Sequence, residues 1–212
     1  MRRNAERRVE AQACSRRPPR SYNAGMIATS TLTGHLLIAM PGLRDPDFEH
    51  TVTLICQHSE DGALGLVVNR PSDYHLQDLL QQMDISTDDD PLAQQAVLAG
   101  GPLQRERGFV LHNPDGHWAS SYAIDERLML TTSRDILEAI AAGHGPQQML
   151  IALGYAGWEP GQLERELRDN AWLTVAADNE LLFEVPLEQR WIAAAARMGV
   201  DAQRLTHYAG NA

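Results

Sequence analysis

The stretch LGYAGWEPGQLERELRDNAWL, residues 153–173, decides how this chain folds. The apolar run QQMLIALGYA (147–156) leads into it, and its length and composition predict a central, buried strand. Three glycines and Pro160 then break the apolar pattern, because glycine lets the backbone turn sharply and proline suits the first position of a helix. Leu163 and Leu167 follow at helical spacing. We therefore expect a strand, a sharp corner and a helix.

Two interpretations of this corner remain open. Trp158 and Leu163 have the spacing of a hydrophobic staple, in which a side chain before a helix packs on its first turn. Free amides at a helix start also attract phosphate, but three glutamates at this end would repel an anion. We favour a structural corner, and the alternative is that Tyr155 or Trp158 lines a pocket.

Strand and helix patterns continue on both sides of this segment. Two β-rich runs, 51–58 and 63–69, flank the turn sequence SEDG and predict a hairpin. A second hairpin is predicted from 172–178 and 181–185, and the acidic stretch 84–95 is predicted to be a surface loop. The remaining predicted elements are strands at 34–40, 97–102, 108–112 and about 128–131, and helices at 76–83, 134–142 (with Ser133 as N-cap) and 188–198.

Composition indicates a globular protein of a reducing compartment. The chain has 212 residues, of which 43% are apolar, so it is long enough to bury a sizeable core. No apolar run approaches the roughly 18 residues that a membrane helix needs. Its two cysteines, Cys14 and Cys56, provide no disulfide framework.

Charge divides the chain into two unlike parts. All 18 basic residues are arginines, and seven of them lie in residues 1–20. The other residues carry 11 arginines against 26 acidic residues, a balance of −15. Nucleic-acid-binding proteins neutralise phosphates with lysine and arginine, so direct nucleic-acid binding by the acidic part is disfavoured.

Residues 1–25, MRRNAERRVEAQACSRRPPRSYNAG, are predicted to be a disordered, arginine-rich extension of a domain that spans 26–212. Three interpretations of the extension are open: a nucleic-acid-binding arm, a transit peptide, or an unfolded extension whose true start is Met26. We favour the last. A secretory signal is excluded because no apolar segment follows the arginines.

Five blocks of sequence, in order, resemble the AlgH/YqgE family of bacterial proteins. The resemblance begins at about residue 32 and runs to the C-terminus. The blocks are LLIAMPGLRDPDFEHTVTLICQH (36–58), GALGLVVNRP (62–71), GGPLQRERGFVLH (100–112), LTTS (130–133) and ALGYAGWEPGQLERELRDNAWL (152–173).

This resemblance implies an α+β fold: a single domain with a branched, barrel-like mixed β-sheet and flanking helices, in the bacterial cytosol. The family is named partly for a proposed role in regulating the expression of exopolysaccharide (alginate) genes. It supplies no catalytic residues to transfer, because its molecular activity is not established.

The best candidate for binding a small anion is the segment LAGGPLQRERGF. Gly100 and Gly101 allow a close backbone approach, and the guanidinium groups of Arg105 and Arg107 suit carboxylate or phosphate. The alternative is a glycine turn beside solvated charges. A second candidate is Asn69-Arg70, which ends a strand and could present Arg70 to a cleft, although Asn is also a common turn residue.

Reactive side chains give weaker signals. Cys56 and His58 alternate along one predicted strand and should share a face, about 7 Å apart, which is too far for a nucleophile and its base. Cys56 with His112 is an alternative pair, and a zinc site from His50, Cys56, His58 and His112 lacks any supporting spacing. Asp88 to Asp90 lack the layout of a calcium loop. We predict no catalytic residues, metal site or cofactor.

The sequence favours a regulatory or binding protein that takes a small anionic ligand or a protein partner and has no membrane association. The alternative is an enzyme of unknown reaction, built on the Gly-Gly-Pro/Arg segment with Cys56, His58 or His112.

Overall fold

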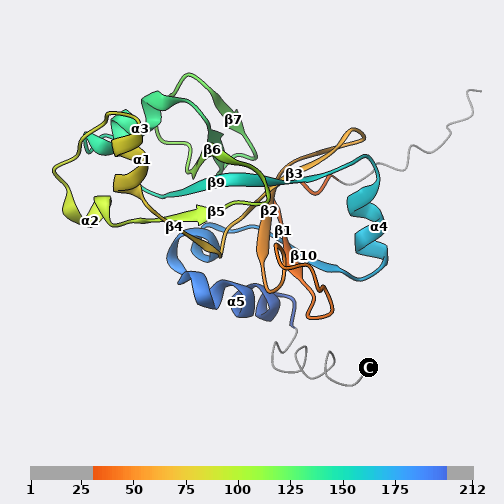
Figure 1. Ribbon diagram of the computed structural model, residues 1–212. Helices are drawn as coiled ribbons and strands as arrows, with labels where there is room; N and C mark the ends of the chain where they lie inside the picture. Colours follow the sequence, from red (N-terminus) through yellow and green to blue (C-terminus); the bar gives the residue numbers. More distant parts are fainter. Residues whose placement is uncertain (1–30, 200–212) are drawn as a thin grey trace, which may run out of the picture. The chain divides into compact units, whose positions relative to one another are not determined.

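Strand β9 (Met149–Trp158) organises the sheet, as its sequence predicts. Residues 152 and 153 pair with β5 (Ala96–Ala99) in parallel and with β6 (Leu103–His112) antiparallel, so β5 and β6 lie on opposite edges of β9. Residues 156–158 pair instead with β3 (Gly62–Val67). In Figure 1, β9 runs from the side of α1 and α3 to the side of α4. The sheet therefore branches at β9.

The computed structural model describes residues 31–199, so the predicted extension 1–25 and the domain start at residue 26 lie outside the described residues. The described residues form one compact unit. Its other strands are β1 (His35–Ala39), β2 (Val52–Ser59), β4 (Pro71–His75), β7 (Ser121–Ala123), β8 (Met129–Thr131) and β10 (Trp172–Ala176). Its helices are α1 (Leu76–Gln82), α2 (Asp90–Ala93), α3 (Arg134–Ala141), α4 (Gln162–Arg168), α5 (Arg190–Arg197), the π-helical turn Glu180–Glu184 and the 3₁₀ turn Leu187–Gln189.

The main path of the sheet runs β10-β1-β2-β3-β9-β6-β8-β7, and β4 and β5 form a branch beside β9. All pairings are antiparallel apart from β5 with β9. The sheet curls into a half-barrel with helices on its flanks (Figure 1). The predicted α+β class, with a branched, barrel-like mixed sheet and flanking helices, is confirmed.

Three apolar clusters cover the faces of this sheet. Helix α5 packs Trp191, Ala194 and Ala195 against β1, β2 and β3. Helices α1 and α3 cover β5, β6 and β9, while α4 packs Leu163 against the opposite faces of β1 and β2. Strand β1 contributes alternate residues to two clusters, Leu36 to one and Leu37 to the other, because successive side chains point to opposite faces.

Buried hydrogen bonds fix α5 in place. The Trp191 indole donates to the carbonyl of Ala39 at 2.9 Å. The guanidinium of Arg190 donates to the carbonyls of Val185 and Val68. Burial lowers the pKa of Arg190 to about 10, which leaves it charged at neutral pH.

The predicted hairpin of 172–178 and 181–185 is wrong. β10 pairs antiparallel with β1, and residues 180–184 form the π-helical turn. Leu181 and Leu182 are both fully buried. In a strand with one buried face, successive side chains alternate between the core and solvent, so one of the two would be exposed; a helical turn can bury both. The Asp178 carboxylate accepts the amide of Leu181 at 2.9 Å and so starts the turn.

One local prediction needs correction. Helix α4 begins at Gln162, after Gly161 in the left-handed region, so Pro160 lies before the helix and not at its first position. Ser133 is the N-cap residue of α3, as predicted, and its hydroxyl donates to Asp135. On α5, Trp191 and Ala195 are buried, whereas Ile192 is 56% exposed.

Candidate ligand-binding site

A cavity of about 320 Å³ lies where the chain enters β4 and β6 beside β9. Its wall includes Arg70 just before β4, Asp73 and Tyr74 within β4, Gly101 from the β5–β6 connection, Arg105 from β6, and Asp47 from the loop before β2. Three of these residues, Arg70, Gly101 and Arg105, come from the two segments that the sequence marks as candidates. The branching of the sheet brings those segments together.

Arg70 secures one wall of the cavity. Its guanidinium donates to the carbonyls of Pro46 and Asp47 at 2.9 Å and to that of Glu49 at 3.1 Å. Carbonyl oxygens satisfy these donors without neutralising the charge, because they carry no formal charge of their own. Arg70 therefore holds the loop 45–49 in place and keeps a positive charge beside the cavity.

Arg105 is the accessible cation of this cavity. Its side chain is 72% exposed, and its contact with the Asp47 carboxylate is long, at 3.4 Å. An exposed ion pair of this kind contributes little stability, and a better anion can displace the carboxylate. The fold thus positions Arg105 at the cavity, and its guanidinium is bound only weakly by the Asp47 carboxylate.

A bulge in β6 places Arg105 at the cavity. Leu103 pairs with Tyr155, and the next register pair is Gly108 with Leu153, so β9 advances by two residues while β6 advances by five. The extra residues 104–107 leave the ladder, and Gln104 has a positive φ of 44°. Bulges re-aim side chains and occur often beside functional sites.

Gly100 and Gly101 allow the connection to cross against the backbone of β9. A Cβ on Gly101 would lie 2.2 Å from the carbonyl carbon of Tyr155, and one on Gly100 would lie 2.4 Å from the carbonyl oxygen of Gly154. Gly100 also donates its amide to Leu153 at 2.7 Å. The close approach predicted for these glycines is thus an approach to the chain's own backbone, and Gly101 also lines the cavity.

Comparisons with known proteins agree on one family. The profile of the AlgH-like family matches residues 36–203. The chain belongs to the AlgH-like family. The resemblance inferred from the five sequence blocks is therefore confirmed.

This AlgH-like chain matches close relatives over almost their whole length. A UPF0301 protein of Thioalkalivibrio sulfidiphilus is 54% identical over 187 residues, which are 88% of this chain and 100% of the relative. One of Methylococcus capsulatus is 56% identical over 180 residues, 85% and 96% of the two chains. The names of these relatives state no activity.

Two solved structures share the fold. The solution structure of the AlgH protein from Pseudomonas aeruginosa is 49% identical, with a TM-score of 0.71 over 84% of this chain and 95% of the other. The crystal structure of a Corynebacterium diphtheriae protein has a TM-score of 0.63 over 84% and 91%, and at 24% identity it shows the fold alone.

Four other predicted site residues of this AlgH-like protein lie outside the Arg70–Arg105 cavity. Asn69 accepts the amide of Val52 at 2.8 Å and donates to the carbonyl of His50 at 3.0 Å, so its amide is used inside the fold. The guanidinium of Arg107 lies 5.2 Å from the centre of the Phe109 ring. The other two residues, Tyr155 and Trp158, pack into apolar clusters.

The corner after β9 is built around Glu166 of α4. One carboxylate oxygen accepts the indole N–H groups of Trp158 at 2.9 Å and Trp172 at 2.8 Å. The other oxygen accepts from the Gln162 amide at 2.8 Å. Both indoles are at least 94% buried and lie in one cluster with Leu163, so the packing expected of the staple is present although the helix starts later.

The prediction that Cys56 and His58 share a face is wrong. The β2–β3 register shifts between Ile55 and Gln57, so Cys56 sits in a bulge and the alternation of side chains changes there. Cys56 lies in the apolar cluster that packs against α5, while His58 turns toward α4 and contacts Glu164. Burial raises the pKa of the Cys56 thiol to about 12, which keeps it protonated and unreactive.

His58 has a structural role at the edge of β2. Its Nδ1 accepts the backbone N–H of Leu32 at 3.1 Å, so the ring proton lies on Nε2 and is donated to Glu164 at 2.8 Å. The pKa of Glu164 is lowered, first by hydrogen bonding from its own backbone N–H and then by His58. This pair joins α4 to the first described residues of the domain.

His112 has the hydrogen bonds of a general base but no access to solvent. Its Nδ1 donates to the carbonyl of Asn113 at 2.6 Å, which leaves Nε2 to accept from the Thr131 hydroxyl at 2.8 Å. Burial lowers the pKa of His112, so the ring is neutral at pH 7. Both His112 and Thr131 are fully buried, so no substrate reaches this pair in the described fold.

The four residues considered for zinc do not converge. Among residues 31–199, no group of three His, Cys, Asp or Glu side chains is placed to hold a metal ion. In the same part of the chain, no helix is long and apolar enough to cross a membrane.

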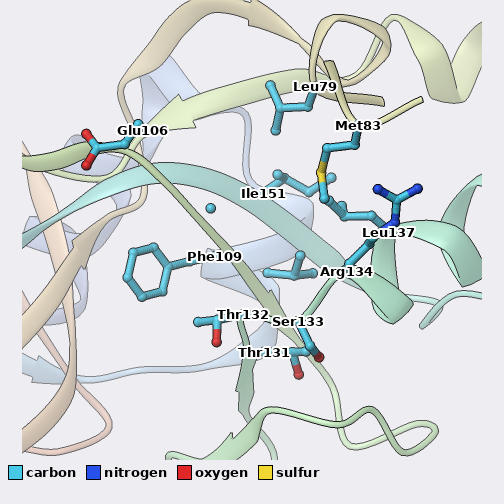
Figure 2. Close-up of a pocket in the computed structure, with 12 residues that line it drawn as sticks. Leu79, Met83, Glu106, Phe109, Thr131, Thr132, Ser133, Arg134, Leu137 and Ile151 are labelled. Atoms are coloured by element: carbon cyan, nitrogen blue, oxygen red, sulfur yellow. The ribbon is translucent and has the colours of Figure 1, made fainter. Parts of the chain in front are cut away.

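Sequence reasoning missed an apolar groove between α1 and α3. Its inner cavity has a volume of about 190 Å³. In Figure 2, Leu79 of α1 and Met83, which follows that helix, lie on one side, and Phe109 and Thr132 lie on the other. A wider cavity of about 550 Å³ continues from it toward Arg105. Apolar residues at helical spacing look the same whether they fill a core or line a groove, so the sequence carries no signal that separates the two.

Proposed function

We propose that this AlgH-like protein is a cytosolic binding protein with a regulatory role, and that it binds a small anion in the Arg70–Arg105 cavity. One observation carries the proposal: two arginines from distant segments lie at one cavity, Arg70 bound to backbone carbonyls and Arg105 in a long, exposed contact with Asp47 at 3.4 Å. Arginine's fork of N–H donors suits a carboxylate or a phosphate.

An enzymatic role has less support. The nucleophile and bases considered from the sequence are separated, with Cys56 and His112 buried and His58 bound to Glu164. The cavity wall carries neither Cys56, His58 nor His112, which favours recognition of a ligand and transmission of that event to a partner. In this proposal, regulation of gene expression is indirect, because the chain outside residues 1–20 has a balance of −15 and would be repelled by DNA.

A thermal-shift titration of the full chain tests the anion site. The probes are inorganic phosphate, succinate and glucose 6-phosphate, each compared with sodium chloride at equal ionic strength to remove screening effects. A ligand at 100 times its Kd adds about 2.7 kcal/mol, which raises the melting temperature of a domain this size by about 5 to 11 °C.

A pair of arginine variants supplies the control. Arg105→Gln removes the accessible cation of the cavity and should abolish the shift. Arg107→Gln removes the same charge two residues away, outside the cavity, and should retain it. A flat screen for all three anions, or an equal loss in both variants, contradicts the proposal.

A further inference from the structure

The Arg70–Arg105 cavity and the apolar groove share their walls. Arg105, Tyr74 and Leu153 line both the anion cavity and the wider cavity beside it. That wider cavity in turn shares five residues with the inner one drawn in Figure 2, namely Leu79, Met83, Glu106, Gly108 and Leu137. The three hollows therefore form one path, which we call the α1–α3 groove, leading from Arg105 to the space between the two helices.

Apolar side chains form the sides and floor of the α1–α3 groove, and Glu106, Gln82 and Thr132 add polar groups along it. Leu79 and Leu137 lie at its helical sides and Leu153 on β9 at its floor. Met83 and Leu153 are only half-buried although they belong to the apolar cluster, so the groove leaves apolar surface open to water. A methionine at the entrance to the inner cavity suits a flexible apolar guest, because its unbranched side chain adapts to irregular shapes.

Charge complementarity orients such a guest. Arg105 stands at one end, and among residues 31–199 its charged partner is Asp47, at 3.4 Å. Arg134 at the other end is paired with Glu138 at 2.7 Å on its own helix. Of the two arginines at the ends of the described groove, Arg105 is therefore the more accessible to an anionic head, and an apolar tail would extend from there toward Met83 and Leu137.

The guest that fits this pattern is a simple aliphatic chain. A peptide would carry an N–H and a carbonyl at every residue past the leucine and methionine side chains of the groove, where these polar groups lose their bonds to water. A methylene chain has no such groups and gains stability from each carbon that leaves water.

We propose that the α1–α3 groove binds a medium-chain fatty acid, with its carboxylate at Arg105 and its chain along Leu153, Met83 and Leu137. This inference rests on the proposed anion site and names the ligand class of that site. It implies that the protein senses acyl chains and not anions in general.

Isothermal titration calorimetry of the full chain with butyrate, hexanoate, octanoate and decanoate, below their micelle concentrations, tests the inference. Affinity should rise about fourfold for each methylene added, until the groove is filled. Decanamide, which lacks the charge, should bind at least about tenfold more weakly than decanoate, because a hydrogen bond to a charged group is the stronger kind.

Two variants assign the head and the tail. Met83→Gln places a polar group in the groove and should weaken decanoate binding while leaving the phosphate response unchanged. The matched control is Met198→Gln, at an exposed methionine on the turn after α5, and it should change neither. Arg105→Gln should weaken both ligands.

The outcomes separate this inference from the proposed function. Binding of phosphate or succinate through Arg105 with no effect of chain length overturns the fatty-acid inference and leaves the anion site standing. No binding of any anion overturns both. Chain-length dependence that survives in both Met83→Gln and Arg105→Gln would show adsorption elsewhere and would also overturn the inference.

Discussion

Replacing Glu166 with alanine should destabilise this protein more than the same replacement at an exposed glutamate. Its carboxylate accepts the indole N–H groups of Trp158 and Trp172 at 2.9 and 2.8 Å, and both rings are almost completely buried. Alanine removes the carboxylate acceptor, so the two buried indole N–H groups lose their hydrogen-bond partner.

The size of the effect follows from those two bonds. A hydrogen bond to a charged group contributes about 1.5 to 3 kcal/mol, so two contribute about 3 to 6 kcal/mol. Glu166 itself is half-buried, and water entering the space left by the carboxylate would recover part of this. We expect a loss of about 2 to 4 kcal/mol for Glu166→Ala, and about 1 kcal/mol for Glu166→Gln, which keeps an oxygen acceptor but loses the charge.

Urea denaturation followed by tryptophan fluorescence measures these losses as a shift in midpoint at constant slope. The melting temperature of Glu166→Ala should fall by about 4 to 16 °C. Glu126→Ala is the control, because Glu126 is exposed and its carboxylate makes no hydrogen bond within the described residues. If Glu166→Ala and Glu126→Ala agree within about 0.5 kcal/mol, the two indole bonds do not hold the corner and the argument fails.

Three further outcomes are expected. Gly101→Ala should cost at least about 2 kcal/mol in urea denaturation, because its Cβ would lie 2.2 Å from backbone, whereas Gly108→Ala, with nothing within 4 Å, should be nearly neutral; equal losses would refute the close approach. In a Cys14→Ser variant, Cys56 should react with a thiol reagent at pH 8 only after denaturant is added, since burial raises its pKa to about 12, and rapid reaction of the native protein would refute this. Glu164 has a lowered pKa, mainly through its own backbone N–H, so its carboxylate stabilises the fold above about pH 4.5, and that contribution is lost as pH falls below it. Wild type should therefore exceed Glu164→Gln in stability at pH 7, and the difference should shrink as pH falls below the lowered pKa of Glu164; a difference that stays constant as the pH falls would contradict the assignment.

Much of the secondary structure is determined locally. The β2–β3 hairpin, the central strand β9 and helices α1 and α3 all follow from apolar period, turn residues and helix length, because these signals act between neighbours in the chain. The predictions fail where tertiary contacts decide. Residues 181–185 have β-forming composition, yet two adjacent leucines both point into the core there, and β10 finds its partner in β1 far away in sequence.

The sequence alone determined the family, the α+β class and the segments that carry arginines and glycines. Only the tertiary structure decided which of them meet. The branch at β9 brings Arg70 and Arg105 to one cavity, the bulge at Cys56 separates it from His58, and the bulge 104–107 aims Arg105 outward and leaves Arg107 against Phe109. Each of these outcomes depends on strand register and on contacts between distant residues, whose long-range pairing no local pattern encodes.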